Sequence, residues 1–174
     1  AQAMETDAFI GGLRERLEAD GHAEDTVLML YTDHYCKYFS DAEFISAIKG
    51  ETDRNMLSNV PFVIWTEGIA PQVYDKYVST MDIAPTVVDL FSLDADLRYY
   101  IGNDMFGPDG GVVYFRNYAW YDGKTYDTGN DASSNPAVLA MREQAREQLD
   151  VSQDTFRYDY FACLQRRGIL NPDE

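Results

Sequence analysis

Basic residues, cysteines and long apolar runs are scarce in this 174-residue sequence. Fourteen Lys and Arg residues stand against thirty Asp and Glu residues, which leaves a formal charge of −16 at pH 7. This balance excludes a nucleic-acid partner, because binding to a phosphate backbone needs clustered Lys and Arg. It also argues against direct docking of this segment on an anionic membrane surface. No apolar run approaches the roughly 18 residues that a membrane-spanning helix needs.

Several recognisable signals are missing as well. The first residues carry neither the basic stretch nor the apolar core of a signal peptide, so any targeting signal is absent or lies in upstream sequence. Glycine-rich phosphate-binding motifs, nucleophile elbows and Cys-x-x-Cys pairs do not occur. The two cysteines, Cys36 and Cys163, allow at most one disulfide, and their number does not indicate a redox compartment.

Aromatic residues, in contrast, are abundant: 13 Tyr, 9 Phe and 2 Trp. That much apolar ring surface argues against a disordered chain and predicts a folded domain. Residues 6–20 predict an amphipathic helix that ends at Gly21. Within it, the Gly11-Gly12 pair is expected to allow the close approach of a neighbouring element.

The next segments alternate between strand and helix patterns. Residues 26–32 and 60–65 are apolar runs without alternation, typical of strands buried on both faces of a parallel sheet. The spacing of Ser40 and Glu43 is that of a capping box and predicts a short helix. Asp82 is the expected N-cap of a helix that extends to residues 90–91. This order of elements predicts an α/β fold.

The pattern changes in the second part. Residues 110–121 predict β-structure, and Asp122-Gly123 between aromatic flanks indicates a two-residue hairpin turn. Pro136 lies in the first turn of the next expected helix, and a last helix should run from about Ser152 to Gly168. The apolar stripe of the first of these helices comprises Val138, Met141, Ala145 and Leu149. We predict one unit of residues 1–174, with an α/β part (1–107) and an antiparallel hairpin with helices (108–174).

Asp33-His34 is the most informative pair for chemistry. Ligands of open α/β sheets bind beyond the carboxyl ends of the strands, and this pair directly follows a predicted strand. Carboxylate and imidazole groups both coordinate divalent cations such as Zn²⁺ or Mn²⁺. The alternative is structural: an Asp that ends a strand, and a His bonded to a nearby carbonyl. His22 lies in an acidic link and is expected at the surface.

The aromatic residues of the predicted hairpin also allow two interpretations. Rings on neighbouring strands mostly pack against one another. Stacking on a sugar or a lipid headgroup is the alternative. The aromatic residues concerned are Tyr114, Tyr118, Trp120, Tyr121 and Tyr126.

Taken in order, six segments resemble a known family. They are residues 6–11 (TDAFIG), 25–35 (DTVLMLYTDHY), 59–65 (NVPFVIW), 79–90 (STMDIAPTVVDL), 102–106 (GNDMF) and 158–161 (YDYF). The set resembles the C-terminal part of the catalytic domain of lipoteichoic acid synthases and related phosphoglycerol transferases, in the sulfatase and alkaline phosphatase superfamily. The resemblance extends over nearly the whole chain.

The resemblance implies a fold, a reaction and a location. The fold would be the C-terminal portion of an alkaline-phosphatase-like α/β/α sandwich, followed by a small antiparallel β-sheet with C-terminal helices. The family transfers phosphoglycerol from a lipid headgroup to a glycan or glycerolphosphate acceptor through a phospho-threonine intermediate. Its catalytic domains are extracytoplasmic and are held at the cell membrane by an upstream anchor. By the same resemblance, Asp33 and His34 supply two ligands to Mn²⁺ or Mg²⁺, with Zn²⁺ as a further option.

The sequence also departs from the family. The nucleophilic Thr, a metal-binding Glu and the headgroup-binding residues belong to upstream sequence, and Thr6, Thr26 and Thr32 do not replace the nucleophile. Tyr35 and Cys36 are weak candidates for substrate binding, since the family usually has Gly where Cys36 stands. We therefore expect the 174-residue chain to be inactive by itself. The alternatives are a sulfatase or phosphodiesterase of the same superfamily, or a non-catalytic glycan-binding domain.

Overall fold

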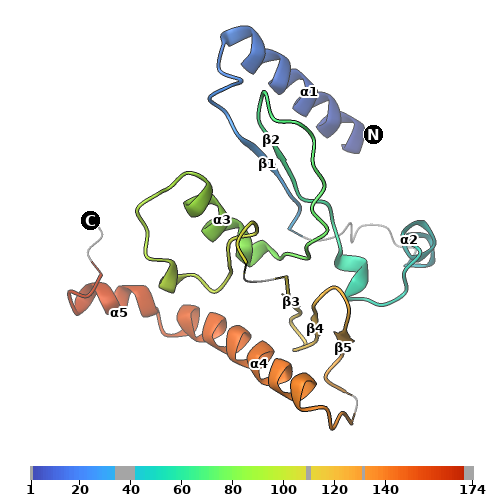
Figure 1. Ribbon diagram of the computed structural model, residues 1–174, viewed down its shortest axis with the longest axis vertical. Coiled ribbons are helices and arrows are strands. Elements are labelled where there is room, and N and C mark those ends of the chain that lie inside the picture. Colours follow the sequence, from blue (N-terminus) through green and yellow to red (C-terminus); the bar gives the residue numbers. More distant parts are fainter. Residues whose placement is uncertain (1, 34–41, 109–110, 131, 171–174) are drawn as a thin grey trace. The chain divides into compact units, whose positions relative to one another are not determined.

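The computed structural model describes residues 2–33, 42–108, 111–130 and 132–170 (Figure 1). It is a mixed α/β structure with small antiparallel sheets, which confirms the fold class. Internal contacts divide the chain into two compact units, Ala1–Val73 (unit 1) and Tyr74–Glu174 (unit 2). This division lies earlier in the chain than the change of pattern at residues 107–108. Ring contacts join residues on the two sides of that change within unit 2, Tyr77 to Tyr121 and Tyr99 to Phe161.

Unit 1 begins with helix α1 (Gln2–Asp20), which includes the predicted residues 6–20. Gly21 adopts a left-handed conformation (φ 72°), and the amide of His22 donates to the carbonyl of Leu17 over 2.9 Å. This is a Schellman motif, and it ends the helix as predicted. A Cβ atom on Gly11 or Gly12 would meet no atom within 4 Å among the described residues, so the expected close approach to a neighbour is wrong.

The sheet of unit 1 consists of β1 (Leu28–Leu30) and β2 (Val63–Trp65). The strands pair antiparallel, with Met29 opposite Ile64, and their side chains are half-buried or exposed. The predicted strands are therefore present, but the expectation of a parallel sheet buried on both faces is wrong for this pair. An apolar run indicates a strand and carries no information about the direction of its partner.

Helix α2 (Ala42–Lys49) and the 3₁₀ turn η1 (Met56–Ser58) lie between the strands in sequence. Lys49 joins them, because its Nζ donates to the carbonyls of Leu57 (2.7 Å) and Asn59 (2.6 Å). Helix α2 confirms the short helix that the spacing of Ser40 and Glu43 predicted. Ser40 itself lies outside the described residues, so the capping box stays a prediction.

Unit 2 begins with η2 (Thr80–Asp82), which leads directly into α3 (Ile83–Leu90); η3 (Leu97–Tyr99) follows. Asp82 occupies the N-cap position of α3, as predicted, but its side chain makes no capping bond there. Its carboxylate instead forms a capping box with Ser79 at the start of η2. The preceding 3₁₀ turn moves the true start of this helical segment upstream, which the spacing of apolar residues did not reveal.

The second sheet has the order β3 (Val113–Tyr114), β4 (Trp120–Tyr121) and β5 (Tyr126–Asp127), all antiparallel. The predicted β segment 110–121 thus contains a turn, closed by a bond from the Phe115 amide to the Ala119 carbonyl (2.8 Å). Tyr118 takes the left-handed position in this turn (φ 63°). The β4–β5 loop is four residues long (122–125) instead of two, because the Asp122 carboxylate accepts the amides of Lys124 and Thr125.

Two helices complete unit 2. Helix α4 (Pro136–Arg157) has Pro136 in its first turn, and the Asn135 side chain caps it by accepting the Ala137 amide over 3.0 Å. Helix α5 (Tyr160–Arg166) follows a break at Asp159 (φ 49°). The predicted start near Ser152 is wrong, because α4 continues past this residue to Arg157. The predicted stripe on α4 faces inward: Ala145 is fully buried, and Val138, Met141 and Leu149 are half-buried.

Candidate functional site

Asp33 is the one predicted metal ligand that the structure describes. It follows β1 by three residues, where the sequence placed it, and its side chain is exposed. His34, Tyr35 and Cys36 lie outside the described residues. Among the residues that are described, no group of three or more His, Cys, Asp or Glu side chains is arranged to hold a metal ion.

The segments beside Asp33 are joined by aromatic contact within unit 1. The rings of Tyr31, just after β1, and Phe62, just before β2, lie 6.3 Å apart at an interplanar angle of 37°. This contact extends the pairing of the two strands toward the end at which Asp33 leaves the sheet. The predicted position of Asp33 at a strand end is thus supported by local packing. His22 is exposed, as predicted.

A network of buried polar groups lies at the start of α3 in unit 2. Asp82 accepts the Ser79 amide at one carboxylate oxygen (2.7 Å) and the Asn103 amide at the other (2.8 Å). One turn later, the hydroxyl of Thr86 donates to the Asp82 carbonyl (2.6 Å) and accepts the Met105 amide (2.9 Å). Thr86 is completely buried, so these bonds replace those it would make with water.

Hydrogen bonds therefore join two of the segments that carry the family resemblance. Residues 79–86 provide the acceptors, and residues 103–105 provide the amides. Close packing requires a glycine at position 102, directly before these amides. A Cβ atom on Gly102 would lie 2.0 Å from the carbonyl oxygen of Met81. These hydrogen bonds fix the loop against α3. Of the two carboxylates in these segments, Asp82 is buried, whereas Asp104 is half-exposed and accepts the Phe106 amide over 3.1 Å.

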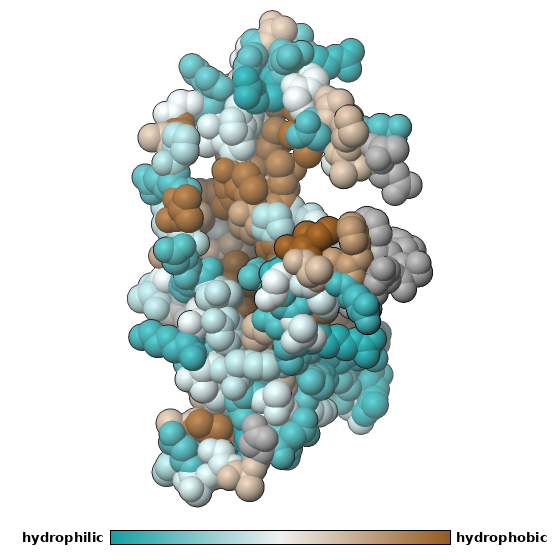
Figure 2. All heavy atoms as spheres, turned by 90° about the vertical axis from the view of Figure 1, so that its right-hand side faces the viewer, coloured by the Kyte–Doolittle hydropathy of each residue, from teal (hydrophilic) through white to brown (hydrophobic). Residues whose placement is uncertain are grey.

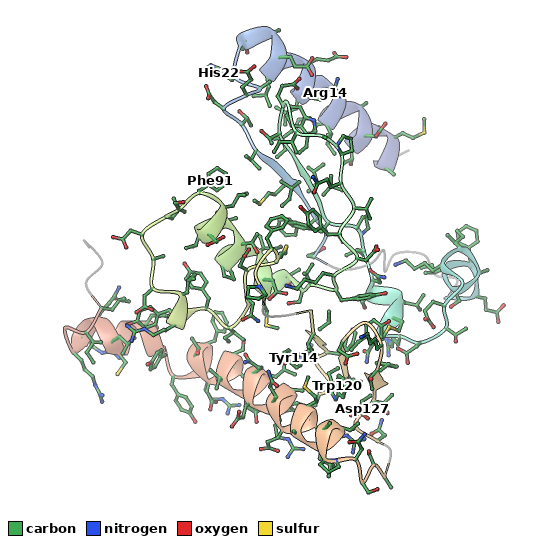
Figure 3. All side chains as sticks on the ribbon, in the orientation of Figure 1. Arg14, His22, Phe91, Tyr114, Trp120 and Asp127 are labelled. Atoms are coloured by element: carbon green, nitrogen blue, oxygen red, sulfur yellow. The ribbon has the colours of Figure 1, made fainter. Side chains whose placement is uncertain are left out.

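The strongest charge pair of unit 2 joins β5 to α4. The Asp127 carboxylate receives two bonds from the Arg142 guanidinium, each 2.7 Å long, and both side chains are largely buried. The bonds from Arg142 hold the pKa of Asp127 below its usual value, although burial opposes this shift. Trp120 lies opposite Asp127 in the sheet (Figure 3), and its indole N–H also acts to lower the pKa of Asp127.

The aromatic residues of the sheet pack against one another. Tyr77 meets Tyr121 at 4.6 Å and 80°, Tyr121 meets Tyr126 at 79°, and Phe115 meets Tyr126 at 81°. These edge-to-face contacts are typical of packed rings and agree with the packing interpretation of the hairpin. Tyr118 contacts α4, since its hydroxyl donates to the Asp150 carboxylate over 3.1 Å. That bond raises the pKa of the Tyr118 phenol.

Comparison with known protein families assigns this chain to a family. The sulfatase family profile matches residues 1–93, more than half of the chain, and its match includes β1, Asp33, β2 and α3. The chain belongs to the sulfatase family. This confirms the membership that the six sequence segments indicated.

Relatives with known names extend the match to the second half of the chain. Lipoteichoic acid synthase 2 of Bacillus subtilis (strain 168) is 23% identical over 175 residues, which cover 91% of this chain and 27% of that protein. The lipoteichoic acid synthase of Staphylococcus saprophyticus is 27% identical over 90% of the chain and 26% of its own length. That of Staphylococcus aureus (strain USA300) is 26% identical, with the same two shares. The chain thus spans about a quarter of the length of these relatives.

Sequence reasoning missed the Asp127–Arg142 pair. The two residues are separated by fifteen positions, a loop and a change from strand to helix. The available signal was an Arg on the otherwise apolar stripe of α4, next to Met141. Its inward position requires a buried acceptor, which only the folded structure identifies.

Proposed function

We propose that this sulfatase-family chain is the C-terminal part of the catalytic domain of a metal-dependent phosphoglycerol transferase. The enzyme would move phosphoglycerol from a lipid headgroup to a glycan or glycerolphosphate acceptor. The observation that carries the proposal is the match of about nine tenths of the chain to proteins named lipoteichoic acid synthases. The position of Asp33 at the end of a strand supports it.

Asp33 and His34 are the proposed metal ligands of this segment. The donor types, a carboxylate oxygen and an imidazole nitrogen, suit Mn²⁺ and Zn²⁺, and the carboxylate also suits Mg²⁺. The exposed side chain of Asp33 is compatible with coordination of an ion together with ligands from other segments. A bound cation would offset negative charge on the phosphoryl oxygens during transfer.

The 174-residue chain should be inactive by itself. The chain supplies Asp33 and His34 as two proposed ligands, whereas catalytic sites for such ions usually have three protein ligands. We expect the nucleophilic Thr in upstream sequence, because none of Thr6, Thr26 and Thr32 matches its place in the family. The incomplete cover of unit 1 agrees with a larger catalytic domain: Tyr31 is 54% exposed and Val63 is 47% exposed.

We place the complete enzyme at the cell membrane, with its catalytic domain outside the cytoplasm. This proposal rests on the resemblance alone. Within the part of the chain that the structure describes, no helix has the length and apolar character needed to cross a bilayer.

Substitutions in the enzyme that contains this chain test the assignment. His34→Ala and Asp33→Asn should each lower phosphoglycerol transfer at least 100-fold, because each would remove a ligand, and the apparent affinity for Mn²⁺ should fall in parallel. Asp25→Asn is the matched control and should retain activity, because Asp25 is an exposed acidic residue that precedes β1 in the chain. Full activity of the His34→Ala enzyme would refute the metal assignment.

An activity assay of the 174-residue chain tests the proposal of incompleteness separately. The purified chain, supplied with Mn²⁺, should release no phosphoglycerol from phosphatidylglycerol and no nitrophenol from nitrophenyl phosphate. Turnover that His34→Ala abolishes would show that this chain holds a complete site. A sulfatase is the second candidate, because the matching family carries that name. Nitrophenyl sulfate hydrolysis by the complete enzyme, without phosphoglycerol transfer, would favour it.

A further inference from the structure

We draw no further inference here: the strongest candidate, the half-exposed apolar surface of the β1–β2 sheet in unit 1, carries none because nothing in the described part of the chain shows what covers it.

Discussion

The two units differ in how they are held together. In unit 2, hydrophobic residues of α3, β4, α4 and α5 are buried, and so are the hydrogen-bonded polar residues Asp82, Thr86 and Asp127. In unit 1, Ala23 and Leu57 are the buried residues among those described, and no polar residue described there is buried. Hydrophobic side chains reach the molecular surface in both units (Figure 2): Phe9 and Ile48 of unit 1 are each 69% exposed, and Phe156 of unit 2 is 84% exposed.

The residues that hold the fold and the residue proposed to bind a metal ion therefore lie in different units. The residues that fix a precise geometry, Asp82, Thr86 and Asp127, lie in unit 2. The proposed metal ligand Asp33 lies in unit 1, which has few buried residues of its own. Substitutions of these buried residues of unit 2 should therefore lower stability strongly. Substitutions at exposed positions of unit 1 should change stability little.

The two tryptophans allow the units to be followed separately. Trp65 is half-buried in β2 of unit 1, and Trp120 is 2% exposed in β4 of unit 2. In a Trp65→Phe background, the fluorescence of Trp120 reports the unfolding of unit 2 alone. The predictions below use this background for unit 2 and far-ultraviolet circular dichroism for the helices.

Gly102→Ala should have the largest effect. The added Cβ would lie 2.0 Å from the Met81 carbonyl oxygen and 2.7 Å from the Asp82 amide nitrogen, so the loop would have to move away from α3. The bonds from Asn103 to Asp82 and from Met105 to Thr86 would be lost together. We expect a loss of at least about 4 kcal/mol in the free energy of unfolding of unit 2, measured by urea titration of Trp120 fluorescence.

Gly107→Ala is the matched control for this substitution. Its nearest neighbour would be the flexible carboxylate of Asp104, 3.1 Å from the new Cβ, instead of backbone. The loss should be below about 1 kcal/mol, because a side chain of this kind can rotate away. Equal effects of the two variants would contradict the close approach of residue 102 to η2.

Asp127→Asn should have the next largest effect. It leaves the largely buried guanidinium of Arg142 without its charged partner, a change that costs about 3 kcal/mol in comparable pairs. The pKa of Asp127 is lowered in the folded state, so the pair stabilises the protein above the unfolded pKa of about 3.9 and loses its effect as the pH falls through the folded pKa. The difference between wild type and variant should therefore be constant above about pH 5 and narrow below about pH 3.9.

Asp96→Asn provides the comparison for the ion pair. Asp96 also bonds to an arginine, Arg98, which lowers its pKa, but the guanidinium of Arg98 is 88% exposed. Water screens such a pair, so its loss should leave the urea midpoint nearly unchanged. A large effect of Asp96→Asn, or none of Asp127→Asn, would show that burial does not distinguish the two pairs.

Sequence reasoning succeeded where the signal is local. Gly21 and Gly168 end helices with positive φ angles of 72° and 65°, and Pro136 lies in the first turn of one. These features depend on residues within one helical turn, which the sequence displays directly.

It failed where the decisive contact is distant. The partner of Arg142 is fifteen residues away, and the direction in which β1 and β2 pair is set by contacts across more than thirty residues. The left-handed Tyr118 is a further case, because such turn positions usually carry Gly or Asn. Its support comes from α4, through Asp150 and through Arg146, whose guanidinium carbon lies 5.9 Å from the ring centre.

The last prediction is a gain in stability and concerns α1 in unit 1. Gly11 and Gly12 lie within this helix with open space around them, so replacing both by Ala should stabilise it by about 1 kcal/mol per residue through helix propensity. Gly21→Ala is the matched comparison: space is open there too, but φ is 72°, and the new side chain should cost about 1 kcal/mol. Thermal unfolding followed by circular dichroism at 222 nm measures both changes. A loss of stability in the Gly11→Ala, Gly12→Ala variant would mean that another segment packs closely on this face of α1.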